Sequence, residues 1–315
     1  MRVVFLGSPP FATPILKRLL EGSHQVLALV TPPDRPRGRG REVVRSPLVE
    51  VALERGIEVV QPTTTKDAAF VEQLAGFGAD ALAVASYGEI LRTNVLELCP
   101  HGALNVHASI LPRWRGASPI QRAIAAGDAE TGVTIQRMVL ALDAGPIAVT
   151  RRTPIGERET AADLFERLSI LGADALVEAL DRIEAGEAEF EPQDESRVTL
   201  APKLRKSDGV LDFSENSAAV ERHVRAMTTW PGARTTLPGG RDLVVLEARP
   251  VSPGSLGNED VAASPGTLLD ETTFTVRTGD GAVRLGRVKP AGKAAMDGEA
   301  FLRGARVARG DTLGT

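Results

Sequence analysis

The chain has 315 residues, of which 43% are apolar and 25% charged, and its formal net charge is −4 at pH 7. This composition is typical of a globular protein, and the length suffices for two domains that each bury a core. The acidic balance excludes a generally basic surface for nucleic acid, so a polyanionic partner would need a local patch. The single cysteine, Cys99, excludes an intramolecular disulfide and a cysteine-based zinc site, and we interpret it as a buried thiol.

The N-terminal half alternates strand-like and helix-like patterns. Strands are expected over residues 3–6, 26–30, 81–85 and 103–106, and helices over residues 12–20, 47–55, 66–77 and 89–98. This alternation predicts βαβ units and a mainly parallel sheet. The first strand follows Met1-Arg2 directly, without a signal peptide, and no apolar run is long enough to span a membrane. We therefore expect a cytoplasmic protein, and nothing in the sequence demands more than a monomer.

Two further strands, 133–139 and 147–152, precede a long helix predicted over residues 160–185. From Gly186 onward the chain becomes polar and rich in proline, which is typical of a linker laid over a surface. A helix over residues 217–227 and short strands at 243–247, 273–276 and 283–288 then favour a small barrel or sandwich. We expect a first domain over residues 1–188, a linker over 189–206 and a second domain over 207–315.

Two loops at the carboxyl ends of the first strands bear on binding. The segment Gly7-Ser8-Pro9-Pro10-Phe11-Ala12 lacks the G-x-G-x-x-G spacing, which disfavours a dinucleotide site. The loop over residues 34–45 contains five arginines, namely Arg35, Arg37, Arg39, Arg41 and Arg45. It is either a solvated surface loop or a docking site for a phosphate backbone, since the planar guanidinium binds phosphate through two hydrogen bonds.

Asn105 and His107 are the strongest candidates for catalysis. Residues two apart on a strand project to the same side, and the irregular loop over residues 108–117 places them at a strand end. An amide and an imidazole there could stabilise an oxyanion and supply an acid. Asp143, in a Gly-Pro turn between two strands, is either an ordinary turn residue or the group that orients His107. His24, His101 and His223 show no comparable setting, and we interpret them as structural.

These residues lie in segments that resemble the folate-dependent formyltransferases. The resemblance rests on residues 105–120, with the run Asn-Val-His-Ala-Ser-Ile-Leu-Pro-Arg-Trp-Arg-Gly, on 131–136 and on 142–147. Further matches narrow the resemblance to the branch of this family that acts on methionyl-tRNA. They are the arginine-rich loop, the linker segment 199–204, and the C-terminal motifs at 230–233 and 288–293. Ile110 and Ser118 depart from the residues common in the family, Leu and Ala, without a consequence for chemistry.

The resemblance implies a doubly wound, Rossmann-like α/β catalytic domain and a C-terminal OB-like β-barrel that contacts tRNA. It implies transfer of a formyl group from 10-formyltetrahydrofolate to the α-amino group of methionine on initiator tRNA, with Asn105, His107 and Asp143 as catalytic residues and no metal. The folate-binding residues that it implies are Ser86, Tyr87, Gly88, Ile90, Leu91, Ser109, Ile110, Leu111, Pro112 and Leu140.

Two alternatives stay open at this point. An amino-sugar nucleotide formyltransferase would share Asn105, His107 and Asp143 but would need neither the arginine-rich loop nor this C-terminal domain. A non-catalytic RNA-binding protein that kept the fold would have no need for the complete set of Asn, His and Asp.

Overall fold

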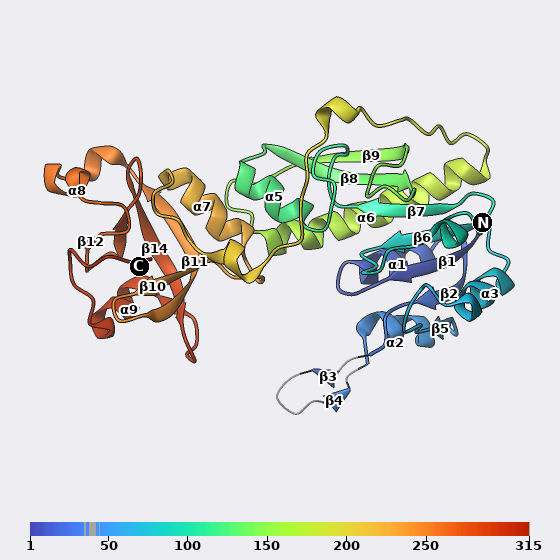
Figure 1. Cartoon of the computed structure of the whole chain (residues 1–315), viewed down its shortest axis with the longest axis horizontal. Helices are drawn as coiled ribbons and strands as arrows, with labels where there is room; N and C mark the ends of the chain where they lie inside the picture. The colour runs from blue at the N-terminus through green and yellow to red at the C-terminus, as the bar shows by residue number, and fades with distance from the viewer. Residues whose placement is uncertain (35, 38–41, 44, 315) are drawn as a thin grey trace. The chain divides into compact units, whose positions relative to one another are not determined.

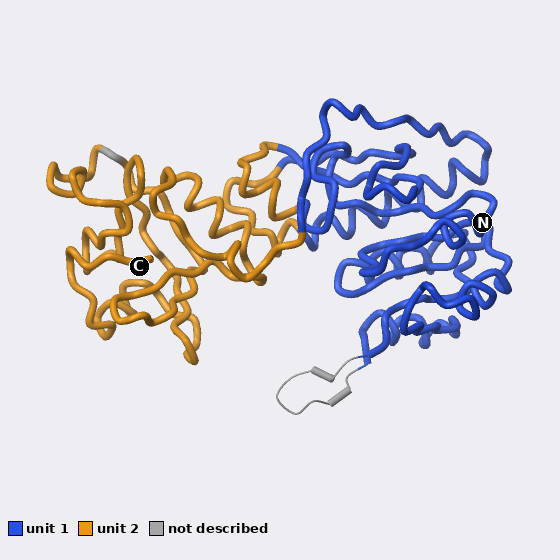
Figure 2. The backbone as a smooth tube through the Cα atoms, viewed as in Figure 1, with its two compact units in different colours: residues 1–119, 130–154, 165–202 blue, residues 120–129, 155–164, 203–315 orange. Residues whose placement is uncertain are grey.

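The computed structural model describes residues 1–34, 36–37, 42–43 and 45–314. The chain divides into two compact units (Figure 2). The first comprises residues 1–119, 130–154 and 165–202, and the second comprises residues 120–129, 155–164 and 203–315. The two units are described separately.

The first unit is built on a seven-stranded sheet in the order β5-β2-β1-β6-β7-β8-β9 (Figure 1). Its strands are β1 (Arg2–Gly7), β2 (Gln25–Val30), β5 (Glu58–Val60), β6 (Ala81–Ala85), β7 (Ala103–His107), β8 (Glu130–Arg137) and β9 (Ile147–Pro154). The five strands from β5 to β7 are parallel, and β8 and β9 are antiparallel additions. The strand order reverses between β1 and β6, so the mainly parallel, doubly wound sheet expected for this part of the chain is confirmed.

Helices cover both faces of this sheet. They are α1 (Ala12–Leu20), α2 (Pro47–Glu54), α3 (Ala68–Gly76), α4 (Thr93–Leu96) and the long α6 (Ala161–Glu184), of which residues 165–184 belong to this unit. On one face, α1 contacts α6 through Arg18 and Asp174, whose Nε and Oδ1 atoms are 2.9 Å apart. On the other, α3 and α4 pack on alternate residues of β1 and β6, including Leu6 and Leu82. No helix within the described residues combines the length and hydropathy that crossing a membrane requires.

Helix α6 lies directly against β7 and β8. A Cβ atom at Gly172 would lie 2.7 Å from the Cγ1 atom of Val106, so only glycine allows this close approach. Val106 therefore points toward α6. Asn105 and His107, which flank Val106 on β7, project from the opposite face because side chains alternate along a strand.

The helix predicted over residues 89–98 is wrong in extent. Only Thr93–Leu96 is helical, and residues 86–92 form an irregular loop. The Glu89 carboxylate accepts hydrogen bonds from both the backbone N–H and the hydroxyl of Thr65, and Ile90 is 79% exposed. The apolar pattern of this stretch thus belongs to a loop held by a distant segment. The sequence analysis also missed β5, which has only three residues.

The second unit contains an antiparallel sheet in the order β10-β11-β14-β13-β12, with β15 beside β14. The strands are β10 (Arg234–Leu237), β11 (Arg241–Val251), β12 (Leu268–Asp270), β13 (Thr275–Arg277), β14 (Ala282–Pro290) and β15 (Met296–Asp297). Irregularities in the register of β11 bend this sheet into a half-barrel (Figure 1). The OB-like β-barrel fold that the resemblance implied for the C-terminal domain is thus supported.

The helices of the second unit border this sheet. They are α7 (Ser217–Ala226), α8 (Asn258–Ala262) and α9 (Gly298–Ala305), together with most of α5 (Pro119–Ala126). Phe274 and Phe301 stack with ring centroids 5.8 Å apart, which joins α9 to the sheet. The sequence analysis predicted α7 and the central strands but missed β10, β12, β15 and α9, which have only four, three, two and eight residues.

Candidate active site

The candidate site is built on β7 and β8. Asn105 and His107 of β7 lie opposite Gln136 and Thr134 of β8 in the antiparallel register. Cross-strand partners project from the same face of a sheet, so these four polar side chains form one patch. Three of them are buried: His107 is 5% exposed, Gln136 1% and Thr134 not at all. Asn105 is half-buried.

His107 lies between a carbonyl oxygen and a carboxylate. Its Nε2 atom is 3.0 Å from the carbonyl oxygen of Trp114, and its Nδ1 atom is 3.6 Å from Oδ2 of Asp143. A carbonyl oxygen can only accept, so Nε2 carries a hydrogen. The Nδ1 atom faces the Asp143 carboxylate at a distance slightly longer than a direct hydrogen bond.

Asp143 is held by two hydrogen bonds to its carboxylate. Oδ2 accepts from the backbone N–H of Gly116 at 2.8 Å, and Oδ1 accepts from Nε2 of Gln136 at 3.0 Å. The backbone of Asp143 has a φ angle of 48°, a left-handed conformation that aspartate adopts more readily than most residues other than glycine. The structure therefore brings Asn105, His107 and Asp143 together, as the hypothesis that Asp143 orients His107 requires.

The loop over residues 109–116 is tied to β8 by Thr134. The Thr134 hydroxyl donates to the carbonyl oxygen of Ser109 at 2.7 Å and accepts from the N–H of Leu111 at 3.1 Å. The Ser109 hydroxyl in turn donates to the carbonyl oxygen of Arg113 at 2.6 Å. These bonds fix the curve that brings the Trp114 carbonyl over His107.

A second layer of polar residues behind Asp143 was missed by the sequence analysis. The Gln193 amide has the carbonyl oxygens of Asp143 and Gly145 on one side and the guanidinium of Arg115 on the other. Arg115, which is 6% exposed, also forms a two-point ion pair with Glu195. The hydrogen bond from Arg115 lowers the pKa of the Glu195 carboxyl. The positions carried a signal, because Arg115 lies in the Pro-Arg-Trp-Arg-Gly run and Gln193 and Glu195 are in the polar segment after α6.

That polar segment is bonded along the first unit. Glu191 and Ile147 exchange two backbone hydrogen bonds, and Arg115 pairs with Leu200 in a parallel bridge. The N–H of Trp114 also donates to the hydroxyl of Thr199 at 2.9 Å. Residues 191–201 therefore back the loop that carries the Trp114 carbonyl.

The residues expected to bind folate lie in two loop segments and at Leu140. Ser109, Ile110, Leu111 and Pro112 lie in the loop after β7, whereas Ser86, Tyr87, Gly88, Ile90 and Leu91 follow the carboxyl end of β6. Burial raises the pKa of the Tyr87 hydroxyl to about 12. Leu140, 65% exposed, lies with Leu142 in the loop between β8 and Asp143.

A cavity of about 530 Å³ lies beside Leu140. Its lining includes Cys99, Gly102, Met138 and Val139 as well as Leu140, so it opens between the segment before β7 and the segment after β8. Of the ten residues expected to bind folate, Leu140 is the only one in that lining. Burial raises the pKa of the Cys99 thiol to about 11, in agreement with its interpretation as a buried thiol.

The arginine-rich loop is described in part. Pro36–Arg37 and Glu42–Val43 form a two-stranded pair, β3 and β4, and Arg45 is exposed. Arg35, Arg39 and Arg41 lie outside the described residues. The choice between a solvated loop and a phosphate-binding loop therefore stays a prediction.

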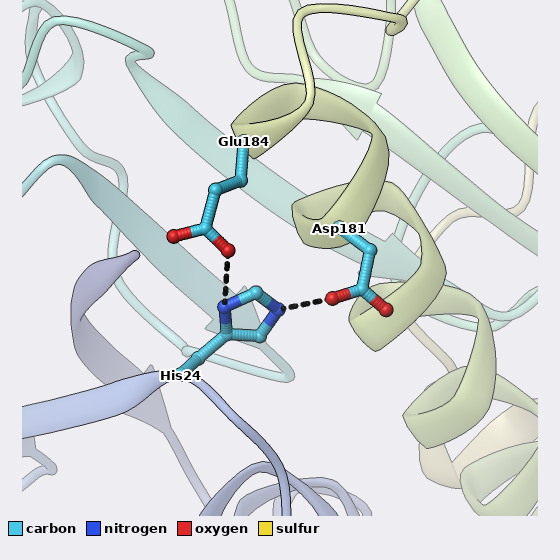
Figure 3. A group of neighbouring side chains, drawn as sticks. All are labelled: His24, Asp181 and Glu184. Atoms are coloured by element: carbon cyan, nitrogen blue, oxygen red, sulfur yellow. Dashed lines mark ion pairs between the residues drawn. The ribbon is translucent and has the colours of Figure 1, made fainter.

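A separate cluster of titratable groups joins the residue before β2 to α6. The imidazole of His24 lies between Asp181, 3.2 Å from Nε2, and Glu184, 3.8 Å from Nδ1 (Figure 3). Both carboxylates are exposed, whereas the His24 side chain is fully buried. Two carboxylates around one imidazole form a local charge cluster, in keeping with a structural role for His24.

Comparison with known proteins identifies the family. The chain matches the formyl transferase family over residues 1–180 and the formyl transferase C-terminal domain over residues 203–306. It is 42% identical over 314 residues to a methionyl-tRNA formyltransferase of Solibacter usitatus (strain Ellin6076), covering 100% of this chain and 99% of the relative. A methionyl-tRNA formyltransferase of Symbiobacterium thermophilum is 43% identical over 310 residues, covering 98% of this chain and 93% of the relative.

The fold also occurs in a solved structure. The crystal structure of HypX from Aquifex aeolicus in complex with tetrahydrofolic acid superposes with a TM-score of 0.62 and 22% identity, covering 96% of this chain and 47% of that chain. At this identity the likeness concerns the fold. The two domain matches and the full-length relatives decide the family: this chain belongs to the formyl transferases, together with the methionyl-tRNA formyltransferases.

Proposed function

We propose that this protein transfers the formyl group of 10-formyltetrahydrofolate to the α-amino group of methionine on initiator methionyl-tRNA. The observation that carries the proposal is the convergence of Asn105, His107 and Asp143 at the end of β7, in a chain related over its full length to methionyl-tRNA formyltransferases. The reaction joins an uncharged amine to an activated acyl donor, so the protein must stabilise an oxyanion and manage one proton.

Asn105 and His107 stabilise the charge that develops on the formyl oxygen. As the amine attacks the formyl carbon, this oxygen gains negative charge, and donors aimed at it lower the barrier. The Asn105 amide, on the same face of β7 as the ring of His107, supplies one donor. The protonated imidazole supplies the second once substrate displaces or shares its contact with the Trp114 carbonyl.

Asp143 orients His107 and relays the proton that the amine loses. Its Oδ2 atom lies 3.6 Å from Nδ1 of His107 and is fixed there by the N–H of Gly116. A carboxylate in this place orients the ring and accepts a proton from the attacking nitrogen directly or through a water molecule. The proton passes to the folate nitrogen as the bond between that nitrogen and the formyl carbon breaks, and tetrahydrofolate is the leaving group.

The remaining assignments belong to the same proposal. Residues 86–91, 109–112 and Leu140 hold the folate, and the arginine-rich loop with the C-terminal domain, residues 207–315, holds the acceptor tRNA. Residues 1–188 form the catalytic domain, and 189–206 connect the two. The protein acts as a cytoplasmic monomer in translation initiation.

The direct test is transfer of labelled formyl from 10-formyltetrahydrofolate to charged initiator methionyl-tRNA. Free methionine and uncharged initiator tRNA are the controls, and label is expected on the charged tRNA alone. An amino-sugar nucleotide, the acceptor of the alternative function, is offered in a parallel reaction. Label on the sugar and none on the tRNA would keep the chemistry of Asn105, His107 and Asp143 and overturn the proposed acceptor.

A further inference from the structure

Gln193 connects four parts of the site through one side-chain amide. Its Nε2 atom lies 2.8 Å from the carbonyl oxygen of Asp143, 2.7 Å from that of Gly145 and 3.3 Å from Oε1 of Gln136. Its Oε1 atom accepts from Nε and Nη2 of Arg115 at 3.0 and 2.9 Å. All of these residues belong to the first unit.

The amide can satisfy these partners in only one orientation. Carbonyl oxygens only accept and a guanidinium only donates, so a reversed amide would set oxygen against three oxygens and NH₂ against the guanidinium. The two-point ion pair of Arg115 with Glu195 holds the guanidinium in the plane that this orientation requires. Gln193 is therefore fixed from one side by Arg115 and acts on the turn of Asp143 from the other.

The turn that Gln193 holds leads directly to the candidate catalytic carboxylate. Asp143 has a left-handed backbone, with a φ angle of 48°, which aspartate tolerates in turns where neighbouring groups hold it. The two shortest hydrogen bonds of Gln193 go to the carbonyl of this residue and to that of Gly145, two positions further on. Gln193 also contacts Gln136, whose Nε2 donates to Oδ1 of Asp143. Backbone and carboxylate of Asp143 are thus fixed through the same amide.

We propose that Gln193 is a positioning residue for formyl transfer, held by the Arg115–Glu195 ion pair, that keeps the Asp143 carboxylate against His107. The proposal rests on the proposed function for its kinetic consequences. The proposal gives the polar segment between the two matched family domains a role in the reaction. Without this role, the segment would only connect the two domains. The hydrogen bonds of Gln193 do not reach His107 or Asn105, so its effect passes through Asp143, Gly145 and Gln136.

The discriminating variant is Gln193→Glu. Glutamate has the same shape and still pairs with Arg115, but it loses both hydrogens that reach the carbonyls of Asp143 and Gly145. We expect kcat to fall about 10- to 100-fold, the loss typical of a displacement near 1 Å, with the KM values of both substrates changed less than about twofold. The matched control is Gln73→Glu on α3, where Gln73 is exposed and, among the described residues, bonds only to Glu58 at 3.4 Å.

A spectroscopic measurement separates positioning from a merely structural role. The chain has four histidines, so ¹⁵N-labelled imidazole signals are few, and that of His107 is assigned by its loss in a His107→Gln variant. We expect Gln193→Glu to shift the Nδ1 signal of His107 and to leave those of His24, His101 and His223 in place. This readout needs no substrate, so it stands even if formyl transfer to methionyl-tRNA is not observed. An unshifted His107 signal with wild-type kcat in a folded Gln193→Glu protein would overturn the proposal.

Glu195→Ala provides a second variant that leaves Gln193 in place. Its side chain is 71% exposed, so the fold should tolerate the change, while Arg115 loses the partner that fixes it. We expect the same shift of His107 and the same fall in kcat, each smaller than in Gln193→Glu. The exposed Glu187→Ala serves as control. If Gln193→Glu fails to fold and Glu195→Ala behaves like Glu187→Ala, Gln193 has only a structural role and the proposal is wrong.

Discussion

The two sides of the candidate site differ in how far their polar groups are already bonded. On the side of His107 and Asp143, the imidazole contacts the Trp114 carbonyl and the carboxylate accepts from Gly116 and Gln136. On the other side, the Asn105 side chain is half-buried and makes no hydrogen bond within the described part of the chain. Both residues lie two positions apart on one strand, so the difference comes from their surroundings.

The difference follows from what each group has to do. A residue that carries a proton must be oriented before substrate arrives, and buried partners provide that orientation. The Asn105 amide acts only on charge that develops on the formyl oxygen, so a partner in the resting protein would compete with that role. His107, the second donor, also carries a proton and exchanges or shares its contact with the Trp114 carbonyl when substrate binds. The bonded side should therefore couple activity to stability, whereas Asn105 should affect activity alone.

Replacement of His107 should have the largest effect. His107→Ala removes both the acid and the ring that contacts Trp114, and we expect kcat to fall about 10²- to 10⁴-fold. The part-buried Trp114 carbonyl loses the ring that donates to it, which should lower the free energy of unfolding by about 1–3 kcal/mol. Single-turnover formylation and urea titration measure the two quantities. His101→Ala is the control, and near-normal turnover in His107→Ala would contradict the assignment.

Asn105→Ala tests the unbonded side. Loss of one oxyanion donor should reduce kcat by about 10²- to 10³-fold. Because the amide has no partner to lose among the described residues, the melting temperature should stay close to that of the wild type. A large fall in melting temperature would show that Asn105 is a structural residue, and the comparison between the two sides would then fail.

Asp143→Asn tests the coupling on the bonded side. The two carboxylate oxygens each accept from a donor, so an amide in either orientation sets its NH₂ against Gly116 or Gln136. We expect a loss of about 1–3 kcal/mol in the free energy of unfolding together with a fall in kcat of about 10- to 100-fold. Asp194→Asn is a matched control, because only one oxygen of Asp194 accepts there. Unchanged stability in Asp143→Asn would mean that these bonds contribute little.

The smallest expected effect concerns the arginine-rich loop. Replacing Arg39 and Arg41 by alanine should weaken tRNA binding and lower the slope of log K against log salt by about 1–2, since each phosphate contact contributes about 0.7–0.9. Folate binding should be unchanged. The matched control replaces Arg18 of α1 and Arg182 of α6, whose side chains are 41% and 51% exposed. An unchanged salt slope would indicate that the loop is a solvated surface loop and does not bind phosphate.

Local patterns in the sequence account for the frame of the site. The alternation of strand and helix predicted the doubly wound sheet, because apolar periodicity reflects which face of each element is buried. The period of two along β7 placed Asn105 and His107 on one face. The same reasoning failed for residues 89–98, where Thr65 bonds Glu89 and holds an apolar stretch as a loop.

Tertiary structure decided which distant residues complete the site. Asp143 reaches His107 only because a left-handed turn after β8 folds back on the strand, and Gln193 reaches that turn only because the polar segment after α6 pairs with Ile147 and Arg115. No local pattern encodes such contacts, since the sequence around a polar loop residue is the same whether its side chain faces solvent or a buried carbonyl. The sequence by itself thus determined the sheet and the pair on β7. The partners of that pair depend on chain segments brought together by packing, whose hydrogen bonds exist only after folding.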